Sequence, residues 1–243
     1  MKSFLPFIAL LCFFFSQIQA QPIDFWSGIE TFDGPTDENP ILAAQLDFYF
    51  DKLVAPLPDS ITMEISRLTE RTNDNPALRD FILWHLLQKY QHPEYMSQDQ
   101  VFVWLYDHYF SQLEIKDLNE SNLALIRAKA ERLRRLALFH PAPDFKWKDF
   151  DGWQSIESEY TALLFYDHDC EVCQQEVRDL DSVCNAHPEI TALKIDMTDD
   201  VAGLDQLYEL YDIETTPLLY VLDRDKRIIA KKIRAKQIDL VVE

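Results

Sequence analysis

Two cysteines separated by two residues are the part of this sequence best suited to chemistry. Cys170 and Cys173 follow a run of aliphatic and aromatic residues, 160–166, that predicts a buried strand, and they begin a segment that predicts a helix. At the first turn of a helix, free backbone N–H groups and the helix dipole favour a thiolate, here at Cys170. Cys173 lies one turn further on, close enough for a disulfide. This arrangement is suited to thiol–disulfide exchange.

Two other roles for the pair have to be considered. Cys170 and Cys173 could form a static structural disulfide, or they could supply half of a zinc site. A zinc site needs two further ligands, but His168 and His187 are isolated and no second Cys or His pair follows at ligand spacing. We therefore expect redox chemistry, with neither a metal nor an organic cofactor.

A second feature lies at Thr215-Thr216-Pro217, directly before the apolar run Leu218–Leu222. A proline at the start of a strand can have a cis peptide bond. The backbone that precedes it is then free to pair with an extended substrate. The sequence therefore predicts a substrate-binding element at Thr216 and Pro217.

The order of elements after residue 140 alternates between strand and helix. After the strand and the helix that carry the two cysteines, the pattern predicts further elements in the ranges Ile190–Met197 (strand), Val201–Tyr211 (helix), Leu218–Leu222 (strand), Arg227–Ile233 (strand) and Ala235–Val242 (short closing helix). Strands and helices that alternate in this way predict an α/β domain with a mixed sheet. The order strand, Cys-x-x-Cys, helix, strand, helix, Thr-Pro, hairpin resembles the thioredoxin superfamily.

Within that superfamily, the sequence is most similar to the exported TlpA-like branch. Pro143-Asp144-Phe145 resembles the start of those domains, Glu176 matches a glutamate common in the branch, and Asp223–Lys226 matches a hairpin turn near their end. The resemblance covers about residues 143–243. It implies an α/β thioredoxin fold, a nucleophilic Cys170, a resolving Cys173, and a cis Pro217 that faces the pair.

Three positions depart from the thioredoxin pattern. Asp169 replaces the usual aromatic residue before the first cysteine, Arg178 replaces a helix proline, and Leu164 replaces a buried aspartate. These changes affect proton handling and rate rather than the disulfide itself. Glu176 could accept a proton from Cys173 if its side chain turns back toward the first helical turn, or it could be an exposed helix residue. Cys184, three turns after Cys173, is expected to be a buried structural thiol.

The charge distribution is strongly acidic. The chain of 243 residues has a net charge of −19, and residues 149–223 contain 19 acids against two bases. This charge argues against nucleic acid or an anionic membrane surface as a partner. Acids close to a thiol disfavour its thiolate, so we expect Asp167, Asp169 and Glu171 to oppose ionisation of Cys170 and to give a low reduction potential. His168, if protonated, would partly offset them. The same acids suggest basic or neutral clients.

The part of the chain before residue 141 has a different organisation. Residues 1–20 have the basic start and apolar run of a secretory signal peptide, although a retained anchor is the alternative. Residues 21–40 predict a flexible leader, and residues 41–140 predict an all-α helical domain of about five helices and unknown function. Asn75, Ser97 with Gln100, and Ser121 are the predicted helix starts. Residues 141–243 form the predicted thioredoxin-like domain.

These observations predict an exported, periplasmic or secreted, thiol–disulfide oxidoreductase. Its partners would be protein thiols or disulfides and an upstream redox partner, with membrane contact only if the signal segment is retained. The direction favoured by the acidic surroundings of Cys170 is reductive. The alternative is a catalytically weak adaptor, in which the helical domain binds a partner and the thioredoxin fold serves as a scaffold.

Overall fold

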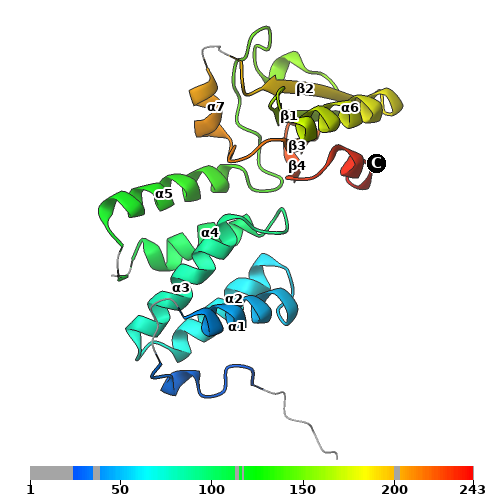
Figure 1. Ribbon diagram of the computed structural model, residues 1–243. Coiled ribbons are helices and arrows are strands. Elements are labelled where there is room, and N and C mark those ends of the chain that lie inside the picture. Colours follow the sequence, from blue (N-terminus) through cyan, green and yellow to red (C-terminus); the bar gives the residue numbers. More distant parts are fainter. Residues whose placement is uncertain (1–23, 35–38, 113–114, 117, 200–202, 243) are drawn as a thin grey trace, which may run out of the picture.

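The computed structural model describes residues 24–34, 39–112, 115–116, 118–199 and 203–242. In this part of the chain, five α-helices precede a region that contains a four-stranded sheet (Figure 1). The predicted signal segment, residues 1–20, lies outside the described residues. None of the helices in the described part has the length and apolar character needed to cross a membrane.

Asparagine side chains begin three of the five N-terminal helices. These helices are α1 (Pro40–Lys52), α2 (Pro58–Arg71), α3 (Pro76–Gln91), α4 (Asp99–Leu105) and α5 (Glu120–Arg135), and a wider helical turn, η2 (Tyr106–Phe110), continues α4. Asn75 Oδ1 accepts a hydrogen bond from the backbone N–H of Leu78 at 3.2 Å, as its predicted N-cap role requires. Asn39 and Asn119 cap α1 and α5 in the same way.

Two predicted helix starts are wrong. The last helix of this region begins after Asn119, two residues before Ser121. Ser97 and Gln100 form no capping box, because the N-cap of α4 is Gln98 and no side chain caps this helix. The Gln100 amide instead donates to the carbonyl of Leu133 at 3.1 Å, so a contact with α5 replaces the local one.

Part of the predicted flexible leader is packed. Within residues 24–34, Trp26 and Ile29 are buried in the core of the helical region. Arg71 on α2 holds the segment by ion pairs with Asp24 at 2.8 Å and Glu30 at 2.6 Å, and it also donates to the carbonyl of Trp26. The prediction of a loose leader is therefore wrong for these residues, because two apolar side chains are buried against the helices.

The second half of the chain forms a mixed sheet of four strands in the order β2-β1-β3-β4. The strands are β1 (Tyr160–Tyr166), β2 (Ile190–Asp196), β3 (Leu218–Leu222) and β4 (Ile228–Lys231). Strand β1 is parallel to β2 and antiparallel to β3, and β3 is antiparallel to β4. With α6 (Glu171–Ala186), α7 (Leu204–Leu210) and the closing 3-10 helix η4 (Ala235–Leu240), this is the predicted thioredoxin fold.

Side chains alternate between the two faces of the sheet along β1, and on both faces they are buried. Leu163 and Phe165 belong to the core that includes Leu207 of α7. Ala162 and Leu164 belong to the core that includes Leu180 of α6. A helix therefore covers each face, which explains why the run 160–166 is apolar throughout rather than alternating.

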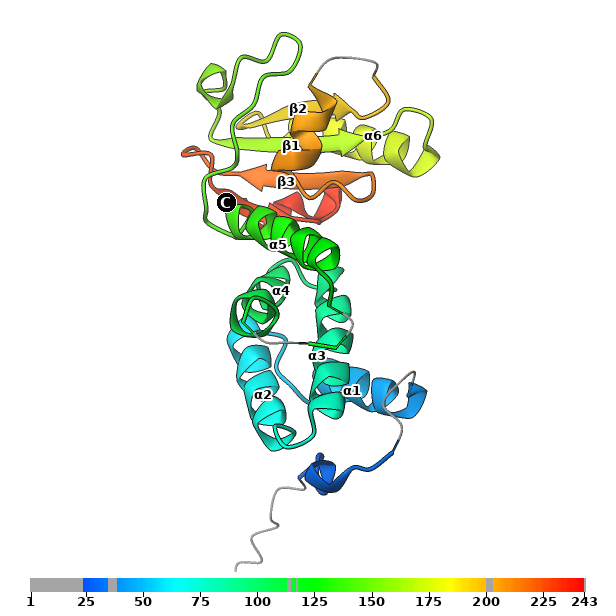
Figure 2. The ribbon, with the colours of Figure 1, turned by 90° about the vertical axis from the view of Figure 1, so that its left-hand side faces the viewer.

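Helix α5 lies between the sheet region and the other N-terminal helices (Figure 2). The predicted boundary around residues 140–143 is hydrogen-bonded to the β3–β4 hairpin and its turn: Phe139 N–H donates to the carbonyl of Ile228 at 2.7 Å, and Ala142 N–H donates to that of Lys226 at 2.8 Å. The two regions are therefore joined along the hairpin, and the connection is not a free linker.

A buried ion pair strengthens this junction. The Lys231 ammonium of β4 contacts the carboxylate of Asp99 on α4, and both side chains are 1% exposed. Lys231 also donates to the carbonyl of Leu136 at 2.5 Å. Burial lowers the pKa of Lys231, and Asp99 opposes that shift. Loss of one partner would leave a buried, unpaired charge.

We predict that Asp99→Asn lowers the free energy of unfolding by about 3–5 kcal/mol, the usual cost of breaking a buried ion pair. Urea unfolding measures the change. Asp151→Asn is the matched control, because the side chains of the Asp151–Lys146 pair are 71% and 79% exposed and solvent screening leaves such a pair little effect on stability. Equal effects of the two substitutions would contradict the assignment of Lys231 and Asp99 as the junction.

Candidate active site

Cys170 is the N-cap residue of α6. Strand β1 ends at Tyr166, three residues form a turn, and the helix begins at Glu171. The Sγ atom of Cys170 accepts a hydrogen bond from the backbone N–H of Cys173 at 3.3 Å. The thiol thus takes the place of the Ser, Asp or Asn oxygen that commonly caps a helix. The predicted position at the first turn is confirmed.

The hydrogen bonds at this N-terminus lower the pKa of Cys170. The largest contribution is a hydrogen bond with the Cys173 thiol, followed by the N–H of Cys173, and the N–H of Val172 adds a smaller one. Partial burial and the negative charge of Asp167 raise the pKa of Cys170, but by less than the hydrogen bonds lower it. Cys170 is half-buried, so its thiolate has both stabilising donors and access to a partner.

Asp167 opposes ionisation of Cys170 as predicted, but the hydrogen bonds outweigh it and the net change in the pKa is downward. Hydrogen bonds act on the sulfur at contact distance, whereas the carboxylates act through space and are partly solvated. His168 also bonds to the acids: its Nδ1 lies 2.8 Å from Asp196, and its Nε2 lies 3.3 Å from Asp169. Asp196 raises the pKa of His168, so this side chain, in the turn before Cys170, keeps a positive charge to a higher pH than an ordinary histidine.

Cys173 has the opposite environment. Its side chain is fully buried, and burial raises the pKa of its thiol, as does the hydrogen bond with Cys170. The Thr216 side chain hydrogen-bonds to Cys173 and partly offsets this increase. Cys170 is thus expected to ionise at a lower pH than Cys173.

The Thr216–Pro217 peptide bond is cis, as the resemblance implies. It lies directly before β3, which pairs with β1 at the centre of the sheet. The contact between Thr216 and Cys173 brings the predicted binding element and the predicted redox pair together, although more than forty residues separate them in the sequence.

Glu176 does not turn back toward Cys173. It is 5% exposed, and its Oε1 accepts the backbone N–H of Ala235 at 2.5 Å. Its Oε2 lies 3.4 Å from Nη1 of Arg234. The side chain connects α6 to the start of η4, which differs from both sequence interpretations: a proton acceptor for Cys173 and an exposed helix residue.

Two other predicted positions lie in the core. Leu164, at the position of the buried aspartate in thioredoxins, is fully buried among apolar side chains between the sheet and α6. Cys184 is half-buried against the same core, and burial raises the pKa of its thiol. Its predicted role as an unreactive structural thiol is consistent with this environment and stays a prediction.

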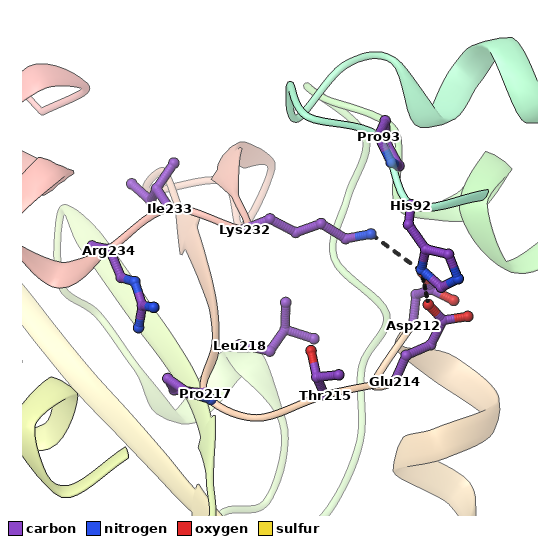
Figure 3. A pocket seen from close by; sticks show the side chains of 10 residues that line it. All are labelled: His92, Pro93, Asp212, Glu214, Thr215, Pro217, Leu218, Lys232, Ile233 and Arg234. Carbon is purple, nitrogen blue, oxygen red and sulfur yellow. Dashed lines mark hydrogen bonds and ion pairs between the residues drawn. The ribbon is translucent and has the colours of Figure 1, made fainter. Parts of the chain in front are cut away.

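The structure adds residues that the sequence analysis did not identify. A cavity of about 300 Å³ adjoins the cis proline and lies between the sheet region and the loop after α3 (Figure 3). His92, Lys232 and Arg234 line it together with Pro217. The basic run that contains Lys232 and Arg234 was visible in the sequence, but nothing there placed His92 in the same cavity as Pro217.

No protein-family model and no curated protein matches this sequence. Among solved structures, the chain is similar to a thioredoxin-like protein from Bacteroides caccae, with 16% identity, a TM-score of 0.67 and 88% of each chain covered. Because that coverage includes the N-terminal helices, the whole arrangement has a structural counterpart. The chain thus has a thioredoxin fold preceded by a helical region.

Two shorter structures match less than half of this chain. One is the thioredoxin domain of a thiol-disulfide oxidoreductase from Bacteroides vulgatus, with 18% identity, a TM-score of 0.40, and coverage of 44% of this chain and 99% of that chain. The other is a domain of a possible thiol-disulfide isomerase from Cytophaga hutchinsonii, with 28% identity, a TM-score of 0.35, and coverage of 43% and 89%.

We predict that Cys170 reacts as a thiolate at a lower pH than an ordinary cysteine. A lowered pKa leaves more thiolate at any given pH, so the rate of alkylation by iodoacetamide should reach half of its maximum below the usual value of about 8.5. Cys173 should react only at higher pH. The rates are measured by mass spectrometry on the reduced protein, with Cys170→Ser as the control. A midpoint at or above pH 8.5 would contradict the hydrogen-bond argument.

Proposed function

We propose that this protein is an exported thiol–disulfide oxidoreductase that reduces disulfides in client proteins. The observation that carries the proposal is the contrast between the two thiols at the start of α6. Cys170 is accessible and has a lowered pKa, whereas Cys173 is buried and has a raised pKa. An attacking thiolate and a protonated resolving thiol are what the two steps of exchange require.

In the first step, the Cys170 thiolate attacks one sulfur of a client disulfide. The client S–S bond breaks, a mixed disulfide forms, and the released client sulfur takes up a proton. In the second step, Cys173 loses its proton to solvent and attacks Sγ of Cys170. The client leaves with both sulfurs reduced, and the two electrons it gains come from the thiols of Cys170 and Cys173, which are left as a disulfide. An upstream thiol donor then reduces this disulfide.

The segment that contains Thr216 and Pro217 is the proposed client-binding element. Thr216 lies against Cys173, so a client chain beside its backbone would bring a disulfide close to the pair. Proline has no N–H, so the backbone at Pro217 cannot donate to a neighbouring strand. We therefore assign the groups that pair with an extended client to Thr216.

Export is proposed from residues 1–20, whose composition is that of a signal peptide. The protein would act in the periplasm or outside the cell after cleavage, or near a membrane if the segment is retained. In such an oxidising compartment, a reductase needs a continuous supply of electrons from an upstream partner.

One observation favours the adaptor as a second candidate. Leu164 is apolar and buried, and both carboxylate oxygens of Glu176 face the η4 segment rather than Cys173. Neither side chain is therefore placed to take the proton from Cys173. Slow resolution would leave a protein that binds clients well but turns over poorly.

We predict that Cys173→Ser accumulates mixed disulfides with clients through Cys170, because the second step is blocked. In the exporting host, non-reducing gels followed by mass spectrometry should detect these adducts, and they should disappear on addition of a reductant. Cys170→Ser should give none, and Cys184→Ser should behave as wild type. Equal trapping by the Cys170→Ser and Cys173→Ser variants would contradict the assigned roles, and full function of Cys170→Ser would favour the adaptor.

A further inference from the structure

The cavity beside Pro217 is built by three separate segments of the chain. Its lining residues lie within the ranges 92–93, 212–218 and 232–234. His92 and Pro93 come from the loop after α3, so the helical region supplies one wall (Figure 3). Lys232 and Arg234 follow β4 on the opposite side. A client that reaches the cysteines along the cis-proline segment would meet this cavity next.

The acids of this cavity are already paired with cations of the helical region. Glu214 contacts the Lys129 ammonium of α5, and it lies 2.9 Å from Nδ1 of His92. Asp212 is 1% exposed and lies 3.5 Å from Lys129 and 3.6 Å from Arg132. These pairs compensate the negative charge on that side of the cavity.

The cations on the opposite side differ in how many of their donors are used. Nζ of Lys232 lies 3.4 Å from Asp212, and Nη1 of Arg234 lies 3.4 Å from Glu176. Each contact uses one donor, whereas a lysine has three N–H donors and an arginine has five. The Arg234 side chain is 58% exposed, so most of its guanidinium is available to a bound molecule.

Arg234 also lines a second cavity, of about 430 Å³, on the side of the cysteines. Val172, which lies between Cys170 and Cys173 in the sequence, is part of that cavity, as are Glu176 and Lys236. Arg234 therefore lies between the N-terminal turn of α6 and the cis-proline cavity. A client bound across the redox pair would pass close to its guanidinium.

The charge of this segment differs from that of its surroundings. Residues 224–236 contain seven bases and one acid, whereas residues 149–223 contain 19 acids and two bases. Three of these bases, Lys232, Arg234 and Lys236, line the two cavities. Five acids line the same two cavities, and four of them, Glu176, Asp179, Asp212 and Glu214, are already in ion pairs. Basic side chains are thus available beside the cis proline in a chain whose net charge is −19.

We propose that Arg234, assisted by Lys232, selects clients that carry an acidic side chain close to the reacting cysteine. The guanidinium would bind that carboxylate through charge-assisted hydrogen bonds, while His92 and Pro93 limit the cavity on the far side. The inference rests on the proposed exchange activity and names its substrate class. It replaces the expectation of basic or neutral clients, which considered the acidic stretch without the basic segment that faces the site.

The test uses octapeptides, each with one cysteine held as a mixed disulfide with 2-mercaptoethanol. A single glutamate is moved through the three positions on either side of the cysteine, and each peptide has a matched glutamine version. Reduced full-length protein is mixed with each peptide, and the second-order rate of reduction is measured at low salt. The readout is the ratio of the glutamate rate to the glutamine rate at each position.

We expect a ratio of about three to five at one or two positions on one side of the cysteine, the size expected for one exposed ion pair. In Arg234→Gln this ratio should fall to about one, and in Lys232→Gln it should fall partway. Arg224→Gln is the matched control, because Arg224 is exposed in the turn at the far end of β3 and its loss changes the net charge by the same amount.

The outcomes separate this inference from the proposed function. Reduction of all peptides with a ratio near one at every position would overturn the selection of acidic clients and leave the exchange activity standing. An equal loss of the ratio in Arg224→Gln and Arg234→Gln would overturn the role of Arg234 in favour of net charge. Failure to reduce any peptide would overturn both proposals.

Discussion

The hydrogen bond from the backbone N–H of Cys173 to Sγ of Cys170 is the interaction on which the site depends. It makes the Cys170 thiol the N-cap of α6, so one hydrogen bond both caps the helix and stabilises the Cys170 thiolate. It also fixes Cys173 one turn further in, where burial keeps its proton in place. The sheet supports this geometry because β1 ends four residues before Cys170 and the segment that carries Thr216 enters β3 beside it.

The helical region is tied to the same sheet. Lys231 of β4 is paired with Asp99 of α4, and Lys129 of α5 is paired with Glu214, two residues before Thr216. Through these ion pairs, the helical region contacts β4 and the segment that leads to the cis proline. The helices place His92 and Pro93 at one end of the client-binding element, which gives a physical reason for both regions to occur in one chain.

Local patterns predicted the strands, the order of elements and the positions of the cysteines, because these features depend on neighbouring residues. The apolar run 160–166 predicted β1 with its observed bounds, and Asn75 predicted the start of α3. Long-range contacts account for the errors. Gln100 bonds to α5 instead of capping α4, and Glu176 bonds to Ala235, 59 residues away. The effect of the acids on Cys170 was misjudged because the sequence does not show which groups contact the sulfur.

The redox equilibrium of Cys170 and Cys173 tests the central claim most directly. The reduced and oxidised fractions are measured by alkylation and mass spectrometry after equilibration in thiol buffers of known potential. A reductase that acts through this pair should show reversible, two-electron behaviour with a potential close to or below that of thioredoxin, about −270 mV. A value near −120 mV would make the protein an oxidant, and a pair that never forms a disulfide would contradict the account.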